Sequence, residues 1–93
     1  MKTFLIGYDL NKSGQDYEQL YSAIKKITPW WHHLDSTWLV VTNENETAVS
    51  IRDKLKAHID DNDELLVINV TGRERAWTGF NDAGSKWLKE SYV

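Results

Sequence analysis

The spacing of hydrophobic residues changes along the chain, and the first stretch has the spacing of a strand. Over residues 2–9 every second side chain is large and apolar, at Phe4, Ile6 and Tyr8. The residues between them, which include Asp9, lie on the other face of such a strand. We therefore predict a strand that ends at Asp9.

A polar break at residues 11–14 separates this strand from an amphipathic helix. Ser13 is the predicted N-cap, and Asp16 complements the start of the helix. Thr28-Pro29 is predicted to end it, because the residue before a proline disfavours helical backbone. The apolar residues between these signals recur at spacings of three and four: Tyr17, Leu20, Tyr21, Ile24 and Ile27.

Two more strands and a second helix follow. The block rich in tryptophan and histidine after Pro29 predicts a second strand, and residues 36–42 predict a third. Leu34-Asp35 forms the tight link between them. Residues 46–59 predict a helix that turns four apolar residues inward: Ala48, Ile51, Leu55 and Ile59. Its basic residues lie on the outer side: Arg52, Lys54 and Lys56.

The last predicted strand, residues 65–71, is apolar on both faces. Alternation puts Leu66 and Ile68 on one face and Leu65 and Val67 on the other. A strand of this kind needs cover on both faces. The sheet that contains it is therefore predicted to be covered by more than one layer.

The element order is β-α-β-β-α-β followed by a tail. It predicts an α+β, ferredoxin-like fold with a four-stranded antiparallel sheet, the first and third strands central, and both helices on one face. We expect one domain over residues 1–93, with a core at 1–72 and a C-terminal strap at 73–93 that includes a helix near 82–91. The tail, a second subunit or both must cover the open face. A homodimer is expected because a chain of 93 residues has a small core.

Composition narrows the classes of function. The chain has a net charge of −3, whereas a general nucleic-acid coat protein is usually basic. The absence of cysteine excludes disulfides, thiolate nucleophiles and cysteine-based zinc sites. No apolar run is long enough to span a bilayer, and no signal-peptide cleavage site follows the N-terminal strand, so we expect a cytoplasmic protein without membrane partners. The acidic residues 60–64 lack the glycine and distal glutamate of a calcium loop and are typical of a solvated turn.

The segment 30–38 holds three of the five tryptophans and two of the three histidines. Such aromatic area covers the protein's own core, a partner chain, or a flat ligand such as nucleic-acid bases. His32 and His33 point to opposite faces of a strand, so one chain cannot bring both to one metal ion. Each is either a hydrogen-bonded structural residue or a general base at a dimer interface.

Several short motifs resemble those of a known superfamily. Tyr8-Asp9-Leu10 ends the first strand, residues 34–40 read LDSTWLV, and residues 65–71 read L-x-V-x-x-V-T. With Trp30-Trp31-His32, these motifs resemble the CRISPR-associated protein 2 superfamily, which also includes virulence-associated protein D, over residues 1–72. More closely, they resemble the small bacterial and phage proteins labelled SinR family.

The resemblance implies a ferredoxin-like homodimer, some of whose relatives are metal-dependent endonucleases. Asp9 is the matching position for a carboxylate that would hold a divalent cation such as Mg²⁺ together with Asp9 of the second subunit. His32 or His33 would assist in this reaction. The basic residues that would contact phosphate are Arg52, Lys56, Arg73 and Arg75.

Two classes of function stay open. One is this endonuclease, acting on RNA or DNA. The other is a non-catalytic dimeric accessory that binds nucleic acid or protein in a defence, toxin–antitoxin or phage setting. Asp9 also fits a structural role, in which its carboxylate caps the following loop, and the basic residues fit a solvated helix face. The lack of a strongly basic segment and of a multi-carboxylate cluster favours the accessory.

Overall fold

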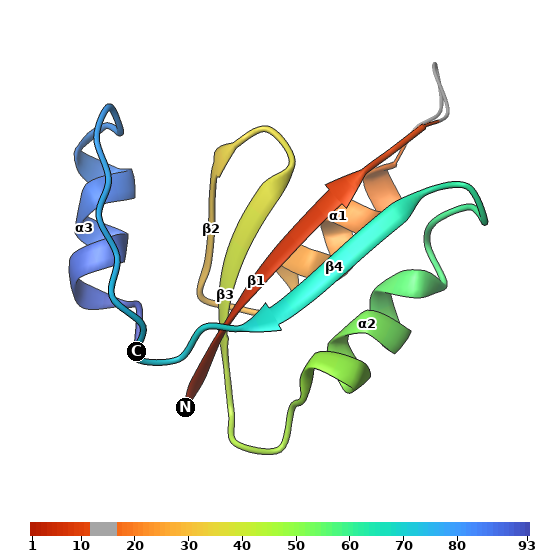
Figure 1. The fold of residues 1–93 in the computed structure, drawn as a ribbon, viewed down its shortest axis with the longest axis horizontal. Helices are drawn as coiled ribbons and strands as arrows, with labels where there is room; N and C mark the ends of the chain where they lie inside the picture. The colour runs from red at the N-terminus through yellow and green to blue at the C-terminus, as the bar shows by residue number, and fades with distance from the viewer. Residues whose placement is uncertain (12–16) are drawn as a thin grey trace.

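The computed structural model describes residues 1–11 and 17–93 and shows an α+β fold (Figure 1). The elements are β1 (Lys2–Asp9), α1 (Glu18–Lys25), β2 (Trp30–Leu34), β3 (Thr37–Thr42), α2 (Ala48–Lys56), β4 (Glu64–Asn69) and α3 (Asp82–Glu90). The four strands form one antiparallel sheet in the order β2-β3-β1-β4. The predicted ferredoxin-like arrangement, with β1 and β3 central and a C-terminal helix added, is confirmed. No helix within the described ranges has both the length and the apolar character needed to cross a bilayer.

Local hydrogen bonds make some elements shorter than the hydrophobic pattern predicts. The second helix was expected over 46–59, but α2 begins at Ala48 because Thr47 and Ser50 form a reciprocal cap. In that cap, the Ser50 backbone N–H donates to Thr47 Oγ1 at 3.0 Å, and the Thr47 N–H donates to Ser50 Oγ at 2.8 Å. Ser13, the predicted N-cap of the first helix, and Asp16, predicted to complement its start, lie outside the described residues.

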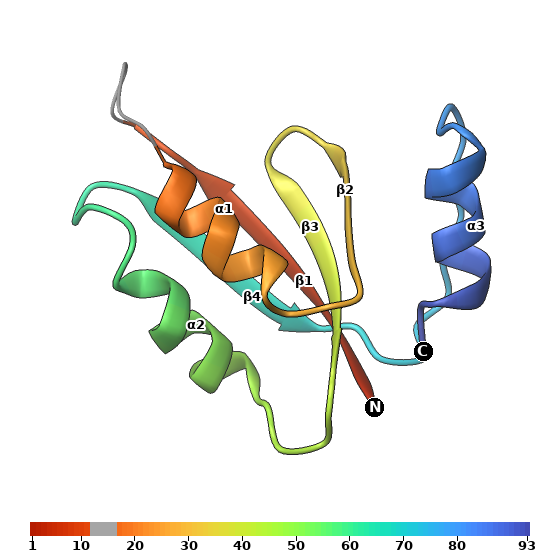
Figure 2. The same ribbon diagram turned by 180° about the vertical axis from the view of Figure 1, so that it is seen from behind.

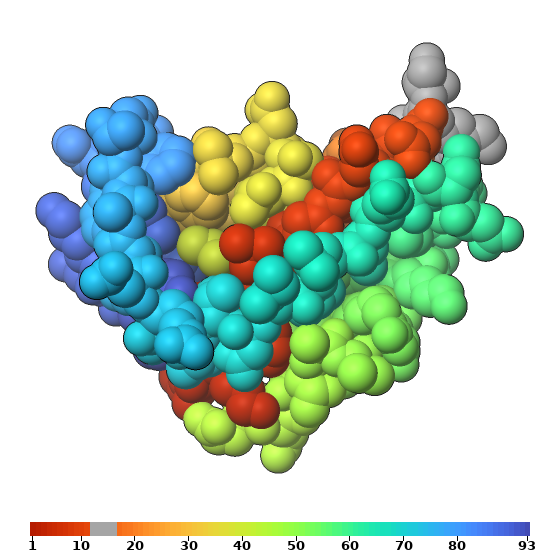
Figure 3. Space-filling model, in the orientation of Figure 1, coloured from red at the N-terminus to blue at the C-terminus, as the bar shows by residue number. Residues whose placement is uncertain are grey.

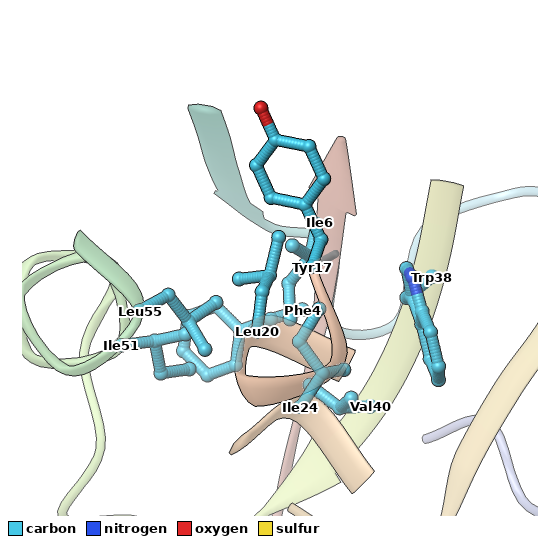
Figure 4. Packing of buried hydrophobic residues seen from close by; sticks show 9 residues of the cluster. All are labelled: Phe4, Ile6, Tyr17, Leu20, Ile24, Trp38, Val40, Ile51 and Leu55. Carbon is cyan, nitrogen blue, oxygen red and sulfur yellow. The ribbon is translucent and has the colours of Figure 1, made fainter. Parts of the chain in front are cut away.

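The main core lies between the sheet and the two helices α1 and α2. Figure 2 shows α1 in front of the sheet on this face, and Figure 4 shows the packed side chains. Completely burying a large apolar side chain contributes about 1.5–3 kcal/mol, so this cluster supplies much of the stability. Its buried members come from both helices, from the residue before α1 and from β1 and β3: Phe4, Ile6, Tyr17, Leu20, Ile24, Trp38, Val40, Ile51 and Leu55.

A second, smaller core lies on the opposite face of the sheet, where the C-terminal segment folds back. Its buried members are Trp31, Leu39, Leu88 and Tyr92. Trp31 and Leu39 belong to β2 and β3, which are adjacent at one side of the sheet. The tail therefore covers that side of the open face with its own chain, one of the alternatives that the sequence left open.

The end of the tail is tied to the first strand through Thr3, a fully buried polar residue. Its hydroxyl donates to the Val93 carbonyl at 3.0 Å and accepts from the Val93 N–H at 3.0 Å. The Thr3 N–H donates to Thr71 Oγ1 at 3.0 Å. Gly72, with a φ of 67°, makes the turn into the tail in a backbone conformation that favours glycine.

Replacement of Thr3 tests how much this tie stabilises the tail. Thr3→Val keeps the shape of the side chain and removes both bonds to Val93, so we expect the free energy of unfolding to fall by about 1–2 kcal/mol in urea denaturation. Thr78→Val, at an exposed position, is the control and should change it by less than about 0.5 kcal/mol. Equal effects of the two changes would show that the tie contributes nothing.

Candidate functional site

A hollow lies on the open face of the sheet, between the strands and the C-terminal segment. We call it the C-terminal trough; its volume is about 430 Å³. Figure 3 shows this face, with the blue C-terminal segment standing beside the yellow and red strands. The lining is mostly apolar and aromatic and includes Leu5, Trp31, Leu39, Val70, Trp77 and Phe80. The trough is therefore a concave surface formed by both the sheet and the tail.

Charged groups lie at one side of the trough, in the segment that follows β4. Arg75 binds the C-terminal segment: its Nε donates to the Leu88 carbonyl at 2.9 Å, and its guanidinium lies 4.0 Å from the centre of the Tyr92 ring. Burial raises the pKa of the Tyr92 hydroxyl above its usual value. Arg73 and Glu74 are exposed and also line the trough. Arg73 is the guanidinium best placed to meet a ligand there.

Beyond the trough, the open face carries an uncovered apolar strip on β4. Leu66 is 56% exposed and Ile68 is 42% exposed. We call these two residues the β4 strip. Isolated exposed apolar side chains are normal, but adjacent ones on the same face of a strand are typical of an interaction surface.

Asp9 ends β1 and is exposed on the same face as the strip. It lies directly opposite Glu64 in the β1–β4 register, and opposite residues of an antiparallel pair share a face. Both line a shallow hollow of about 370 Å³ with Gly7 and Leu66. Two carboxylates are the type of ligand that Mg²⁺ takes alongside water and phosphate. In the ranges 1–11 and 17–93, no group of three or more acidic or histidine side chains could hold a metal ion.

The two histidines lie away from Asp9, each in an aromatic setting on its own face. His32 stacks on Trp38 with 3.7 Å between ring centres, and its Nε2 lies 3.1 Å from the Asp35 carbonyl. His33 packs against Phe80 and against Gly84 of α3. The prediction that they point to opposite faces is confirmed. Neither lines the hollow beside Asp9, so a single chain does not bring Asp9 and a histidine together there.

The basic residues expected to contact phosphate form two separate groups. Arg52 donates to Asp53 Oδ1 from Nε and from a terminal nitrogen, at 3.0 and 2.9 Å. Arg52 and Lys56 share a side of α2, as predicted, and line a groove with Asp60 and Asp61. The other two, Arg73 and Arg75, line the trough. The four predicted contacts therefore do not form one continuous basic patch.

Asp63 is a structural residue that the sequence did not identify. Residues 60–64 were expected to form a solvated turn, but Asp63 is only 9% exposed. Its carboxylate accepts from the Asn11 N–H at 2.9 Å, the Tyr17 hydroxyl at 3.0 Å and the Asp60 N–H at 2.8 Å. Asp63 therefore links the chain before β4 to the residues on either side of the segment between β1 and α1. The bond from the Asp60 N–H is local, three residues earlier in the chain, but the two distant donors leave no trace in the pattern.

Trp38 organises an aromatic cluster on the helix-covered face. Its Nε1 donates to the Tyr8 hydroxyl at 3.0 Å, and its ring lies beside those of Tyr21 and Trp30. Burial raises the pKa of Tyr8, and the hydrogen bond from Trp38 opposes part of that rise. Trp31 and Trp38 thus pack within the protein, whereas Trp30 is 38% exposed.

The raised pKa values of Tyr8 and Tyr92 predict loss of stability in alkali. The folded state holds these phenolic protons more tightly than the unfolded state, so the stabilisation is complete below about pH 10 and is lost as pH rises through the folded pKa values. Urea unfolding between about pH 9 and 12 should show a declining free energy, with a shallower decline for Tyr8→Phe and Tyr92→Phe. An identical decline in both variants and the wild type would contradict this.

Comparison of the chain with models of protein families, with curated proteins and with solved structures gave no match. The resemblance to the CRISPR-associated protein 2 superfamily therefore stays a prediction.

Proposed function

We propose that the protein is a non-catalytic, homodimeric accessory module that binds a protein partner through the C-terminal trough. The observation that carries this proposal is the trough itself, a concave apolar surface about 430 Å³ in volume. Ligand sites typically range from about 300 to 1,000 Å³ and combine aromatic walls with a few polar groups. The trough has both features.

The lining indicates the chemistry of the partner segment. Buried aromatic anchors dominate the energetics of protein interfaces, and Trp77 and Phe80 stand in one wall. The Trp77 Nε1 donates to Ser85 Oγ at 3.2 Å, which fixes the indole and lowers the entropy cost of binding. Arg73 offers a cation nearby. The fitting occupant is a short segment with one large apolar side chain and an adjacent carboxylate.

The charges of the protein favour a protein partner over nucleic acid. Phosphate backbones are recognised by clustered lysine and arginine side chains. Here the net charge is −3, Arg52 is paired with Asp53, and Arg75 holds the tail. A peptide needs only one exposed cation beside an apolar pocket, and Arg73 supplies it.

Selection from a random-peptide display library tests the trough directly. We expect enriched peptides with an apolar residue next to an acidic one. On binding, these peptides should change the chemical shifts of Trp31, Trp77 and Phe80 in the protein. Thr37→Arg places a long side chain at the trough and should weaken binding at least about tenfold. Val49→Arg, at a residue of α2 that is 56% exposed, is the matched control and should leave affinity unchanged.

Two results would overturn the trough as the binding site. One is a selection that enriches no peptide against the folded protein. The other is an enriched peptide whose shift changes lie elsewhere, with equal affinity for the wild type and Thr37→Arg.

The second candidate function is the metal-dependent endonuclease, favoured by one observation. Asp9 and Glu64 lie opposite each other and line an open hollow, which provides two oxygen ligands from one chain. A bound Mg²⁺ would supply Lewis-acid chemistry for phosphodiester cleavage. Asp9 and Glu64 would hold it.

Nuclease assays with Mg²⁺ and Mn²⁺ on single- and double-stranded RNA and DNA separate the two candidates. Our main proposal predicts no cleavage above the buffer level. The endonuclease instead requires cleavage that falls by at least about 100-fold in Asp9→Asn. It should persist in Asp53→Asn, a change at an exposed carboxylate on α2.

A further inference from the structure

β4 is an edge strand whose outer backbone groups have no neighbouring strand in the described sheet. In β1, the Tyr8 N–H bonds toward β3, to the Ser36 carbonyl, whereas the Thr3 carbonyl accepts from Val70 on the β4 side. Because these directions alternate along an antiparallel strand, Glu64, Leu66 and Ile68 bond toward β1. The alternate residues of β4 direct their N–H and C=O groups outward, away from β1: Leu65, Val67 and Asn69.

This edge lacks the features that usually protect edge strands from pairing. Natural edges carry lysines, prolines or bulges, or are very short. The sequence of β4 is ELLVIN, regular over six residues and with Glu64 as its single charge. By contrast, the other edge strand, β2, has an irregular register between Trp31 and Leu34 and contacts α3. Of the two edges, β4 is the one open to another strand.

The space around β4 is open on both sides. A groove of about 540 Å³ runs between α2 and Leu65 on the helix-covered side. The hollow of about 370 Å³ with Gly7 and Leu66 lies on the opposite side. An added strand therefore has room at this edge, with its side chains falling toward the two hollows.

We propose that β4 pairs antiparallel with β4 of a second copy of this chain, centred on Val67, to form one continuous sheet. This interface is the one through which the homodimer of the proposed function would form, so the inference rests on the dimer in that proposal. In this register Val67 faces the partner's Val67, and Leu66 faces the partner's Ile68. The β4 strip thus becomes a cross-strand apolar cluster made of both copies.

The register follows from the directions of the backbone groups. Centring on Val67 pairs all three outward-directed residues: Leu65 with the partner's Asn69, Val67 with the partner's Val67, and Asn69 with the partner's Leu65. Each pair exchanges two hydrogen bonds, or about six in total. Centring on Leu66 reduces this to about four and sets Glu64 against the partner's Ile68. The first register satisfies more backbone groups, and it places Glu64 opposite the partner's Val70, beyond the end of β4.

Charge complementarity favours the same partner. The N-terminal end of β4 is acidic, with Asp61 and Glu64 exposed, and the chain after β4 carries the exposed Arg73 next to Glu74, while Arg75 holds the tail. An antiparallel pair brings the acidic end of each strand next to the basic end of the other. A second copy therefore matches this edge in hydrogen bonding, apolar contacts and charge.

This dimer has a consequence for Asp9. The two β1 strands are separated by three strand spacings, or about 14 Å, and the two Asp9 residues are offset by roughly six residues, or about 20 Å, along the strands. They would thus lie roughly 25 Å apart. A cation shared between the two Asp9 carboxylates is incompatible with this arrangement.

Val67→Pro is the sharpest test, because proline is tolerated in an edge strand where its missing N–H faces outward. The ladder with β1 should survive, while the centre of the dimer loses its two donors. By analytical ultracentrifugation, we expect the wild type and Val67→Thr, which keeps the N–H, to be dimers at tens of micromolar. The dissociation constant of Val67→Pro should rise at least about 100-fold. Peptide binding at the trough should be unchanged, which separates this proposal from the proposed partner site.

A second measurement applies whether or not the proline variant folds. In a mixture of differently isotope-labelled wild-type chains, we expect interchain nuclear Overhauser effects between Leu66 Hα and the partner's Ile68 Hα. A monomeric wild type, a persistent dimer of folded Val67→Pro, or interchain contacts confined to the trough would each overturn the proposal.

Discussion

The contact between Trp31 and the start of α3 determines how the open face of the sheet is divided. Trp31 is 3% exposed, its Nε1 donates to the Gly84 carbonyl at 3.1 Å, and its ring meets Phe80 edge-on with 4.9 Å between centres. A Cβ at Gly84 would lie 3.1 Å from the His33 ring, so glycine permits this close approach. A buried tryptophan that is also hydrogen-bonded stabilises this contact through its large apolar area, and its hydrogen bond fixes the orientation of the two segments.

Because the tail docks over β2 and β3, the other half of the open face stays uncovered. The trough lies along the boundary of the covered half, and the β4 strip lies beyond it. The proposed activities divide in the same way: a partner segment at the trough, and a second copy at the free edge of β4. Asp9 and Glu64 belong to the uncovered half, which explains why they remain exposed.

The sequence predicted the features that depend on local periodicity. Alternation along β1 and β4 and the spacing of Ile51 and Leu55 correctly gave the faces, the helices and the central strands, because residues near in sequence determine them. The helix limits were less accurate, since the cap at Thr47 depends on hydrogen bonds and not on apolar spacing. Contacts between distant residues could not be read: Asp63 binds donors from two other segments, and Arg75 stacks on Tyr92. For the same reason, the residues predicted to form one site lie in separate places in the structure. A motif shows which residues are present but not which ones come into contact.

The central claim is that each chain covers its own β2–β3 half with its own tail. The most direct measurement is an isotope-filtered nuclear Overhauser experiment on a mixture of labelled and unlabelled chains, observing the Trp31 indole proton. We expect strong effects to Gly84 and Phe80 within one chain, at every protein concentration. Effects seen only between chains, or not at all, would contradict it, because the tail would then cover a partner's sheet or leave Trp31 exposed.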